Sequence, residues 1–470
     1  MKKVVIVGAG LGGLASAALL AKAGHDVTVV ERNSWIGGKS RRIDVAGQRI
    51  DTGPSLITFP GVLQELFERY DALGKPGEAS EIAKLNLEKL PEVGRYFFRE
   101  TVVDLPIPKG HQWHEAWARF DREQGHLGPQ ITKLLTSDPF DSQTLPAVTA
   151  ITKNYGMHLS TSAYLKHLDW MPDELKEIIA IHTLNAGIAP ERTLALYATI
   201  AAVMAHDGIS VPTGGVYEIA LALGRLAESA GAKILLNTEV SSISKGKVIA
   251  NGISFEADAI VAATDAQIVD RLLGKRVSRP RRVSCSGVAV FAVLKKPLPE
   301  STVTHSVIMP SQPSALHASL DATAVPAETM AFLNYYKPGH IYPNNKATAA
   351  ILLTAPANGQ KFDFEGEFVQ SELARISALM NLPEPLADLI EDYKMLDPSY
   401  FAEFGAAGGS LYGATRPIWQ GGPFHSPGYW SPLRPWLWRV GASVHPGGGV
   451  PAVLGGAMNS TARLLRALAR

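Results

Sequence analysis

The chain has 470 residues, of which 46% are apolar and 19% charged, and its formal net charge at neutral pH is +1. This length predicts two or three structural units with cores of their own. Intermixed charge without a basic or acidic run argues against a nucleic-acid-binding surface. The single cysteine, Cys285, excludes an intramolecular disulfide and any cysteine-built metal site. We therefore expect no metal centre and, from the cysteine usage, a cytoplasmic location.

The N-terminal residues predict one βαβ unit. Residues 4–7 form a β-branched run typical of a buried parallel strand, and glycine-rich residues 8–13 follow it. An Ala- and Leu-rich helix is predicted at residues 14–23, where Gly24 ends it. A second strand at residues 27–30 completes the unit.

The middle of the chain interrupts this pattern. A short amphipathic helix at residues 61–70 precedes a region, from about 75 to 205, of aromatic segments and polar helices. Helix–strand alternation then returns at residues 221–263. Residues 285–425 predict strands and loops rich in proline and aromatic residues.

The C-terminal residues return to the nucleotide-binding pattern. A last strand at residues 437–440 leads into a glycine-rich turn and a closing helix at residues 453–468. The nucleotide-binding fold is therefore predicted to be assembled from three separated pieces, with other material inserted between them.

The turn at residues 8–13 has the pattern of a dinucleotide site. Gly8 permits the tight turn, Gly10 lets the backbone approach a pyrophosphate, and Gly13 allows the helix to pack closely on the strand. The helix N-terminus presents free N–H groups to phosphates. Glu31, at the end of the second strand, is placed to accept hydrogen bonds from ribose hydroxyls. This context favours a ligand site over a plain structural turn.

Three further segments carry glycines. Residues 37–41 combine paired glycines with Lys39 and Arg41, which either offset pyrophosphate charge or form a solvated basic surface with Arg42. Residues 51–55 read DTGPS. Residues 441–451 place glycines and a new helix N-terminus after a strand, where they either stabilise charge on a reduced flavin ring or form an ordinary loop.

Together these motifs resemble the phytoene desaturase-like family of flavoproteins, which comprises bacterial carotenoid desaturases and carotene isomerases within the amine-oxidase-like flavoprotein superfamily. The matching stretches are VVIVGAGLGGLASAALLAKAGHDVTVVER, IGGKSRRIDVAGQRIDTGPSLIT, VPTGGVYEIALAL and VGASVHPGGGVPAVLGGA. The resemblance implies an α/β protein in which a Rossmann-type FAD-binding domain, assembled from separated segments, carries an inserted α+β substrate domain. We assign residues 1–75, 206–270 and 435–470 to the FAD-binding domain, and residues 76–205 and 271–434 to the substrate-binding domain.

The resemblance further implies non-covalently bound FAD. Glycines of the first turn would take the pyrophosphate, Glu31 the adenosine ribose, and Val240, at the end of a short strand, the adenine edge. Residues after Gly441 would contact the ribityl and isoalloxazine end. The cofactor-binding residues implied in this way are Gly8, Gly10, Leu11, Gly12, Gly13, Glu31, Arg32, Gly38, Lys39, Ser40, Arg41, Gly53, Pro54, Ser55, Val240, Thr264, Gly441, Ala442, Gly449, Val450 and Pro451. Val444, Gly448 and Lys39 depart from the threonine, alanine and arginine usual in the family.

The reaction implied is removal of two hydrogens from an acyclic or hydroxylated carotenoid polyene, with hydride passing to the flavin N5 and electrons to oxygen or a quinone. We assign no catalytic base, because Asp138 and Asp141 fit a solvated surface as well as a site. A carotene cis–trans isomerase and an amine oxidase acting on a soluble amine stay open, as does a non-catalytic binding module. For the amine oxidase, Lys295 and Lys296 are the candidates for a lysine beside the flavin.

A polyene dissolves in lipid, so its entrance is expected to face a membrane surface. No apolar stretch reaches the roughly 18–20 residues that span a bilayer. Residues 194–205, with Tyr197 and Met204, are the candidate for a peripheral contact, and an ordinary core helix is the alternative reading.

Overall fold

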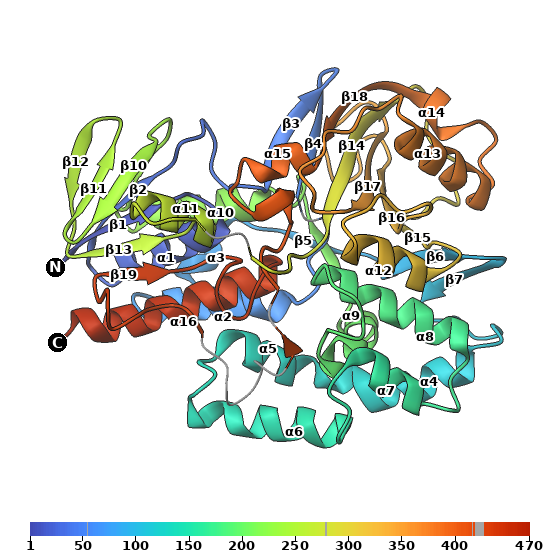
Figure 1. Cartoon of the computed structure of the whole chain (residues 1–470), viewed down its shortest axis with the longest axis horizontal. Helices are drawn as coiled ribbons and strands as arrows, with labels where there is room; N and C mark the ends of the chain where they lie inside the picture. Colours follow the sequence, from blue (N-terminus) through green and yellow to red (C-terminus); the bar gives the residue numbers. More distant parts are fainter. Residues whose placement is uncertain (54, 278–279, 416, 419–426) are drawn as a thin grey trace.

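The computed structural model describes residues 1–53, 55–277, 280–415, 417–418 and 427–470. Pro54, one of the expected cofactor-binding residues, lies outside the described residues. The chain forms a parallel sheet with a β-meander beside it, a second and larger sheet, and a layer of helices along one edge (Figure 1).

The parallel sheet is built from both ends of the chain and has the order β19-β13-β1-β2-β9. Its strands are β1 (Lys3–Val7), β2 (Asp26–Val30), β9 (Lys233–Leu235), β13 (Ala259–Ala262) and β19 (Leu437–Arg439). Along β1, Val4 and Ile6 join the core under the helices, whereas Val5 and Val7 join the core under the meander. Side chains on alternating faces are thus buried on both sides, which explains the continuous apolar run.

Helices cover one face of this sheet and the meander covers the other. Helix α1 (Leu11–Lys22) packs against α10 (Glu218–Ser229) and α16 (Val450–Leu468). The meander consists of β10 (Val240–Ser244), β11 (Lys247–Ala250) and β12 (Ile253–Glu256). Helix α11 (Ala266–Leu272) follows β13 and contacts β10.

The second sheet has seven strands in the order β18-β14-β17-β16-β15-β6-β7. Its strands are β6 (Gly94–Phe98), β7 (Thr101–Leu105), β14 (Ser286–Leu294), β15 (His305–Ile308), β16 (Ala331–Tyr336), β17 (Thr348–Ala355) and β18 (Ile390–Leu396). All its pairs are antiparallel except β15 with β6. Because β6 pairs with a strand two hundred residues away, the sheet joins both inserted regions of the chain.

Helices cover the seven-stranded sheet where loops and strands were predicted. The helices of this part are α12 (Pro313–Asp321), α13 (Glu367–Leu379), α14 (Leu386–Leu389) and α15 (Pro398–Ala402). In α13, Val369, Leu373 and Ile376 are fully buried at helical spacing and pack on the sheet. The prediction of strands and loops alone for this region was therefore wrong. The hairpin β3 (Arg41–Val45) with β4 (Gln48–Thr52) lies against the opposite face.

The remaining helices form the layer along the lower edge in Figure 1. They are α4 (His114–Gln124), α5 (Gly128–Thr136), α6 (Leu145–Tyr155), α7 (Thr161–His167), α8 (Asp173–Ala180) and α9 (Ile200–Asp207). Helices α2 (Pro60–Asp71) and α3 (Glu78–Ala83), and the short pair β5 (Leu87–Lys89) with β8 (Ser210–Pro212), connect this layer to the parallel sheet.

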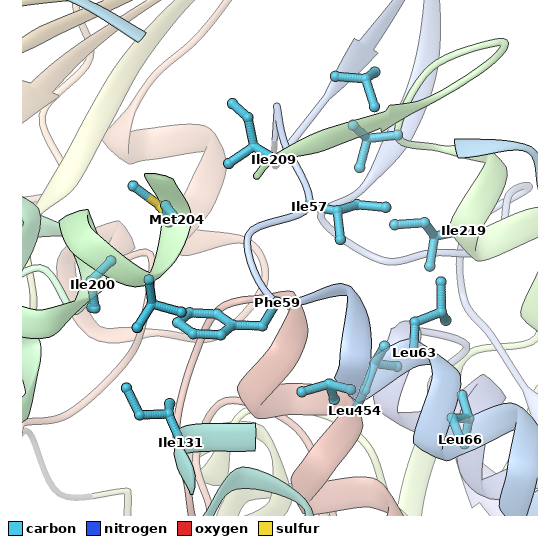
Figure 2. Packing of buried hydrophobic residues seen from close by; sticks show 14 of the residues in the cluster. Ile57, Phe59, Leu63, Leu66, Ile131, Ile200, Met204, Ile209, Ile219 and Leu454 are labelled. Atoms are coloured by element: carbon cyan, nitrogen blue, oxygen red, sulfur yellow. The ribbon is translucent and has the colours of Figure 1, made fainter. Parts of the chain in front are cut away.

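Most of the apolar segment at residues 194–205 lies in the core, although Leu194 at its start is exposed. It folds as a 3₁₀ turn, Ala195–Thr199, followed by α9, and Ala201, Ala202 and Val203 are fully buried. Figure 2 shows Met204 and Ile200 of α9 beside Phe59, which in turn lies near Leu454 of α16. The core-helix reading is therefore right for the part of the segment from Ile200 onward.

Candidate active site

One cavity of about 860 Å³ is lined by residues of both sheets. This volume lies within the range of small-molecule sites. Most of the expected cofactor-binding residues line it: Gly8, Gly10, Leu11, Gly12, Glu31, Arg32, Gly38, Lys39, Ser40, Gly53, Val240, Thr264, Gly441, Ala442, Gly449 and Val450. The sequence predicts Val240 at the end of a short strand, but in the structure Val240 begins strand β10. It nevertheless lines the cavity.

Four expected residues lie outside the cavity lining. Gly13 packs beneath the first turn, and Pro451 lies in the first turn of α16. Arg41 stacks on the rings of Trp35 and Tyr400, with its guanidinium carbon 4.6 and 5.4 Å from their centroids. The Ser55 hydroxyl accepts a hydrogen bond from the Asn334 amide (2.9 Å).

Within the first turn, the fold itself requires glycine at position 13 but not at position 10. A Cβ on Gly13 would lie 2.2 Å from the Gly8 carbonyl oxygen, so the chain itself demands a glycine there. A Cβ on Gly10 would meet no atom within 4 Å, and the φ of Gly10 is −67°, which any residue adopts. Since Gly10 lines the cavity, the space beside it is left for a ligand.

Helix α1 starts directly at this turn, three residues earlier than predicted. Its first intrahelical hydrogen bond runs from the Leu14 N–H to the Gly10 carbonyl (2.9 Å). The N–H groups of Leu11, Gly12 and Gly13 therefore have no partner within the helix. They supply donors and a positive dipole end at the cavity wall, as anion binding requires.

Glu31 is held at the end of β2 by backbone donors. Its Oε2 accepts from the Ala9 N–H (2.8 Å), and its Oε1 accepts from the backbone N–H (2.9 Å) and side-chain amide (2.8 Å) of Asn33. The carboxylate is almost wholly buried and still lines the cavity. Asn33, which also lines the cavity, was not predicted, because a single amide after an acid carries no pattern of its own.

The basic residues Lys39 and Arg42 are largely buried and do not form a solvated surface. The Lys39 Nζ donates to the Leu411 carbonyl (2.9 Å), and burial lowers the pKa of Lys39 although Asp265 opposes that shift. The Arg42 Nε donates to Asp51 (2.9 Å) in a half-buried ion pair. Burial raises the pKa of Asp51, and the Arg42 guanidinium opposes this effect. Lys39 thus reaches the cavity, whereas Arg42 braces the β3–β4 hairpin.

The glycine-rich turns from the two ends of the chain touch. A Cβ on Gly12 would lie 3.3 Å from the Gly441 nitrogen and 3.2 Å from Val453 Cγ1. Gly441 has φ +101° and Gly449 has φ +88°, both in the left-handed region that favours glycine. Helix α16 begins at Val450, so a second helix N-terminus lines the same cavity.

The seven-stranded sheet supplies a second wall of the cavity, which was not predicted from the sequence. Its cavity-lining residues are Ser286, Gly287, Val288, Ala289 and Phe291 of β14, Phe332 of β16, and Leu352, Leu353 and Thr354 of β17. These are ordinary strand residues, so only the fold distinguishes them from core. The acids that line the cavity are Glu31, Glu239, Asp265 and Glu403 among the described residues, and no strand of this sheet carries one of them.

Two weakly acidic groups lie beside this apolar wall. Burial raises the pKa of the Cys285 thiol to about 12 and raises the pKa of the Tyr412 phenol, so both are protonated at neutral pH. The Tyr412 ring fills a slot between two glycines. A Cβ on Gly448 would lie 2.5 Å from the ring and one on Gly187 2.9 Å from it.

Other residues considered from the sequence lie away from the cavity. Lys295 donates to the Asp388 carbonyl and Lys296 pairs with Glu384, both at the surface. Asp138 pairs with Arg463. A carboxylate oxygen of Asp141 accepts from the Gln143 N–H at the start of a 3₁₀ turn. No group of metal-ligating side chains occurs among the described residues.

The chemistry of this cavity fits a dinucleotide flavin. Two helix N-termini and the side-chain-free wall at Gly10 suit a pyrophosphate, and the buried Thr264 Oγ1 lines the cavity without a partner among the described residues. Fold and site together define an FAD-dependent oxidoreductase.

The comparisons with known proteins agree. The chain belongs to the family described as flavin containing amine oxidoreductase, whose sequence profile it matches over residues 11–401. It is 25% identical to a zeta-carotene-forming phytoene desaturase of Myxococcus xanthus, over 99% of this chain and 94% of that protein. It is 24% identical to a 1-hydroxycarotenoid 3,4-desaturase of a Flavobacterium species, over 97% of each.

A solved structure shows the same fold. Cyclohexylamine oxidase of Brevibacterium oxydans superimposes with a TM-score of 0.63 at 15% identity, over all of both chains. Within the part of the chain that the structure describes, none of the helices has both the length and the apolar character needed to cross a membrane.

Proposed function

We propose that the protein is a carotenoid desaturase, which removes two hydrogens from an acyclic or hydroxylated carotenoid. The observation that carries this proposal is the continuity of the cavity. It joins the glycine turns to a wall of seven-stranded-sheet residues, none of which, among those described, carries a carboxylate. The names of the two desaturases to which the chain is similar along its whole length support the same substrate class.

In this proposal the residues of the parallel sheet hold FAD. The N–H groups at the start of α1 would bind the pyrophosphate beside Gly10, and Glu31 would accept from the adenosine ribose. Val240 would meet the adenine edge, and the start of α16 at Val450 would hold the ring end of the cofactor. When bound, FAD supplies a hydride acceptor.

The residues of the seven-stranded sheet bind and orient the polyene. Aliphatic and aromatic side chains such as Ala289, Phe332 and Leu352, which share one face of the sheet, match an apolar chain and exclude water. Loss of hydride leaves positive charge on a conjugated chain, which an aromatic side chain that lines the cavity, such as Phe291, can stabilise. Cys285 cannot act as a base at neutral pH because its thiol is protonated. No protein base is assigned to the proton loss.

An amine oxidase is the weaker candidate. A soluble amine is a cation, and its recognition calls for a carboxylate or an aromatic cage. The sheet side of the cavity has no carboxylate among its described residues, and Lys295 and Lys296 lie too far out to serve beside the cofactor. A carotene isomerase would use the same apolar wall, and analysis of the product distinguishes it from a desaturase.

The test is anaerobic bleaching of the purified yellow protein. Phytoene, a hydroxylated acyclic carotenoid and cyclohexylamine are each added in the same detergent, and the visible flavin absorbance is followed while pigments are separated by chromatography. Bleaching by a carotenoid, with a product two hydrogens lighter, supports the proposal. Bleaching by the amine alone, or a carotenoid product of unchanged mass, overturns it.

The electron acceptor is proposed to be oxygen or a quinone. A quinone shares the lipid phase with a carotenoid, so we further propose a cytoplasmic protein attached peripherally to a membrane. Reoxidation of the bleached protein by air or by a soluble quinone, compared by stopped-flow absorbance, identifies the acceptor.

A further inference from the structure

The exposed apolar side chains of the helical layer concentrate on one short segment. Six of them, each 37% to 93% exposed, occur on or next to α6: Phe140, Leu145, Val148, Met157, Leu159 and Leu194. We call these residues the α6 face. Isolated exposed apolar residues are ordinary on a protein surface, but so dense a group on one segment indicates an interaction site.

The local structure places these side chains toward solvent. Leu145 and Val148 are three residues apart on α6 and therefore share one side of the helix, while Ala147 and Ile151 are buried on the other side. Met157 lies in the turn that ends α6. Leu194 lies near Leu159, because its neighbour Ala195 donates to the Leu159 carbonyl.

Helix α6 is the outermost element of its layer. It packs on α5, which in turn packs on α16, and Figure 1 shows α6 along the lower margin of the molecule.

The central segment of the α6 face carries basic residues only, whereas the exposed Asp141 and Glu191 lie at its edges, next to Phe140 and near Leu194. From Ser142 to Leu168 the sequence contains no Asp or Glu, although acidic and basic residues nearly balance in the whole chain. The same segment carries Lys153 and Lys166, both exposed, and the half-buried His158, whose ring lies 4.6 Å from that of His167. Exposed apolar side chains flanked by lysines suit an anionic lipid surface.

We propose that the α6 face docks on the surface of a bilayer that contains anionic lipid. A second copy of the chain is a poorer occupant. Symmetric pairing would bring Lys153 and Lys166 of two molecules to the same interface, with no acid in the segment to pair with them. The inference deepens the proposed peripheral attachment by naming the surface that binds lipid, and it does not depend on which substrate the cavity oxidises.

The test is sedimentation of the full-length holoprotein with vesicles. Vesicles of phosphatidylcholine alone are compared with vesicles that also contain phosphatidylglycerol, at low and high salt. The wild type is expected to bind the anionic vesicles more strongly, and added salt should weaken this binding. Replacing Leu145, Met157 and Leu159 together with serine should lower the partition coefficient by about tenfold or more.

A matched control keeps the test specific. Ile253 on β12 is also exposed, at 61%, and lies in the meander far from α6 in Figure 1, so Ile253→Ser should bind vesicles like the wild type. The variant Lys153→Glu/Lys166→Glu should lose the preference for anionic lipid and keep its flavin.

Two results would overturn the proposal. One is equal vesicle binding by the triple serine variant and the wild type. The other is a dimer that the triple variant dissociates while the wild type ignores vesicles. Turnover of carotenoid in detergent micelles is measured in parallel. Vesicle binding without such turnover would defeat the proposed function and leave the α6 face intact.

Discussion

Replacing Gly10 with alanine separates ligand binding from folding more cleanly than any other change in the cavity. The new Cβ would meet no protein atom within 4 Å, and φ at −67° suits alanine. The stability of the apoprotein should therefore change by less than about 1 kcal/mol. The methyl group would, however, stand where the pyrophosphate is proposed to approach the backbone.

The expected loss of affinity follows from the contacts at risk. A hydrogen bond from a backbone N–H to a charged phosphate is worth about 1.5–3 kcal/mol, so losing one weakens FAD binding roughly 10- to 150-fold. Titrating apoprotein with FAD and following flavin fluorescence gives the Kd, and urea denaturation of the apoprotein gives the stability.

The comparison variant is Gly13→Ala. Its Cβ would lie 2.2 Å from the Gly8 carbonyl oxygen and 2.9 Å from the Ala263 Cβ, so the backbone must move. We expect a loss of roughly 1–3 kcal/mol in apoprotein stability. An unchanged FAD Kd in Gly10→Ala, or destabilisation equal to that of Gly13→Ala, would refute the division of roles within the turn.

Three further predictions concern the other wall and the core. Burial lowers the pKa of His182 and of His305 to about 4, below the usual 6.5, so the unfolded chain binds more protons between these values. The free energy of unfolding should fall by roughly 3 kcal/mol per histidine as the pH drops from about 6.5 to 4. In His182→Gln the midpoint of urea denaturation should depend less on pH across that range. In Gly448→Ala the new Cβ would lie 2.5 Å from the Tyr412 ring, so the ring should be displaced and the absorbance of the bound flavin should shift. An unchanged spectrum would show that the Tyr412 slot is unrelated to the cofactor. Gly287→Leu should fill part of the cavity beside the apolar wall and lower polyene turnover about tenfold or more, while flavin content per protein stays constant. Turnover equal to that of the wild type would place the substrate elsewhere.

The nucleotide-binding part was predictable because its chemistry is local. Strand β1, the glycine turn and helix α1 follow one another directly at the N-terminus, and Glu31 comes right after strand β2. The starts of α1 at Leu11 and of α16 at Val450 were each placed three residues too late. Glycines and a proline at the start of a helix look like loop residues until the fold shows that they form its first turn.

The cavity wall formed by β14, β16 and β17 could not be predicted from the sequence, and the reason is physical. Ala289, Phe332 and Leu352 come from three strands whose neighbours are fixed only when the sheet assembles. An apolar strand residue that faces a cavity has the same pattern as one that faces the core. The division of the chain into two domains at the stated boundaries stays a prediction.

A crystal structure of the protein with FAD bound tests the central claim most directly. We predict that the pyrophosphate lies against the N-terminus of α1 beside Gly10, with the flavin ring between the start of α16 and the wall formed by β14, β16 and β17. A ring bound outside this cavity, or a pyrophosphate remote from Gly10, would contradict the account.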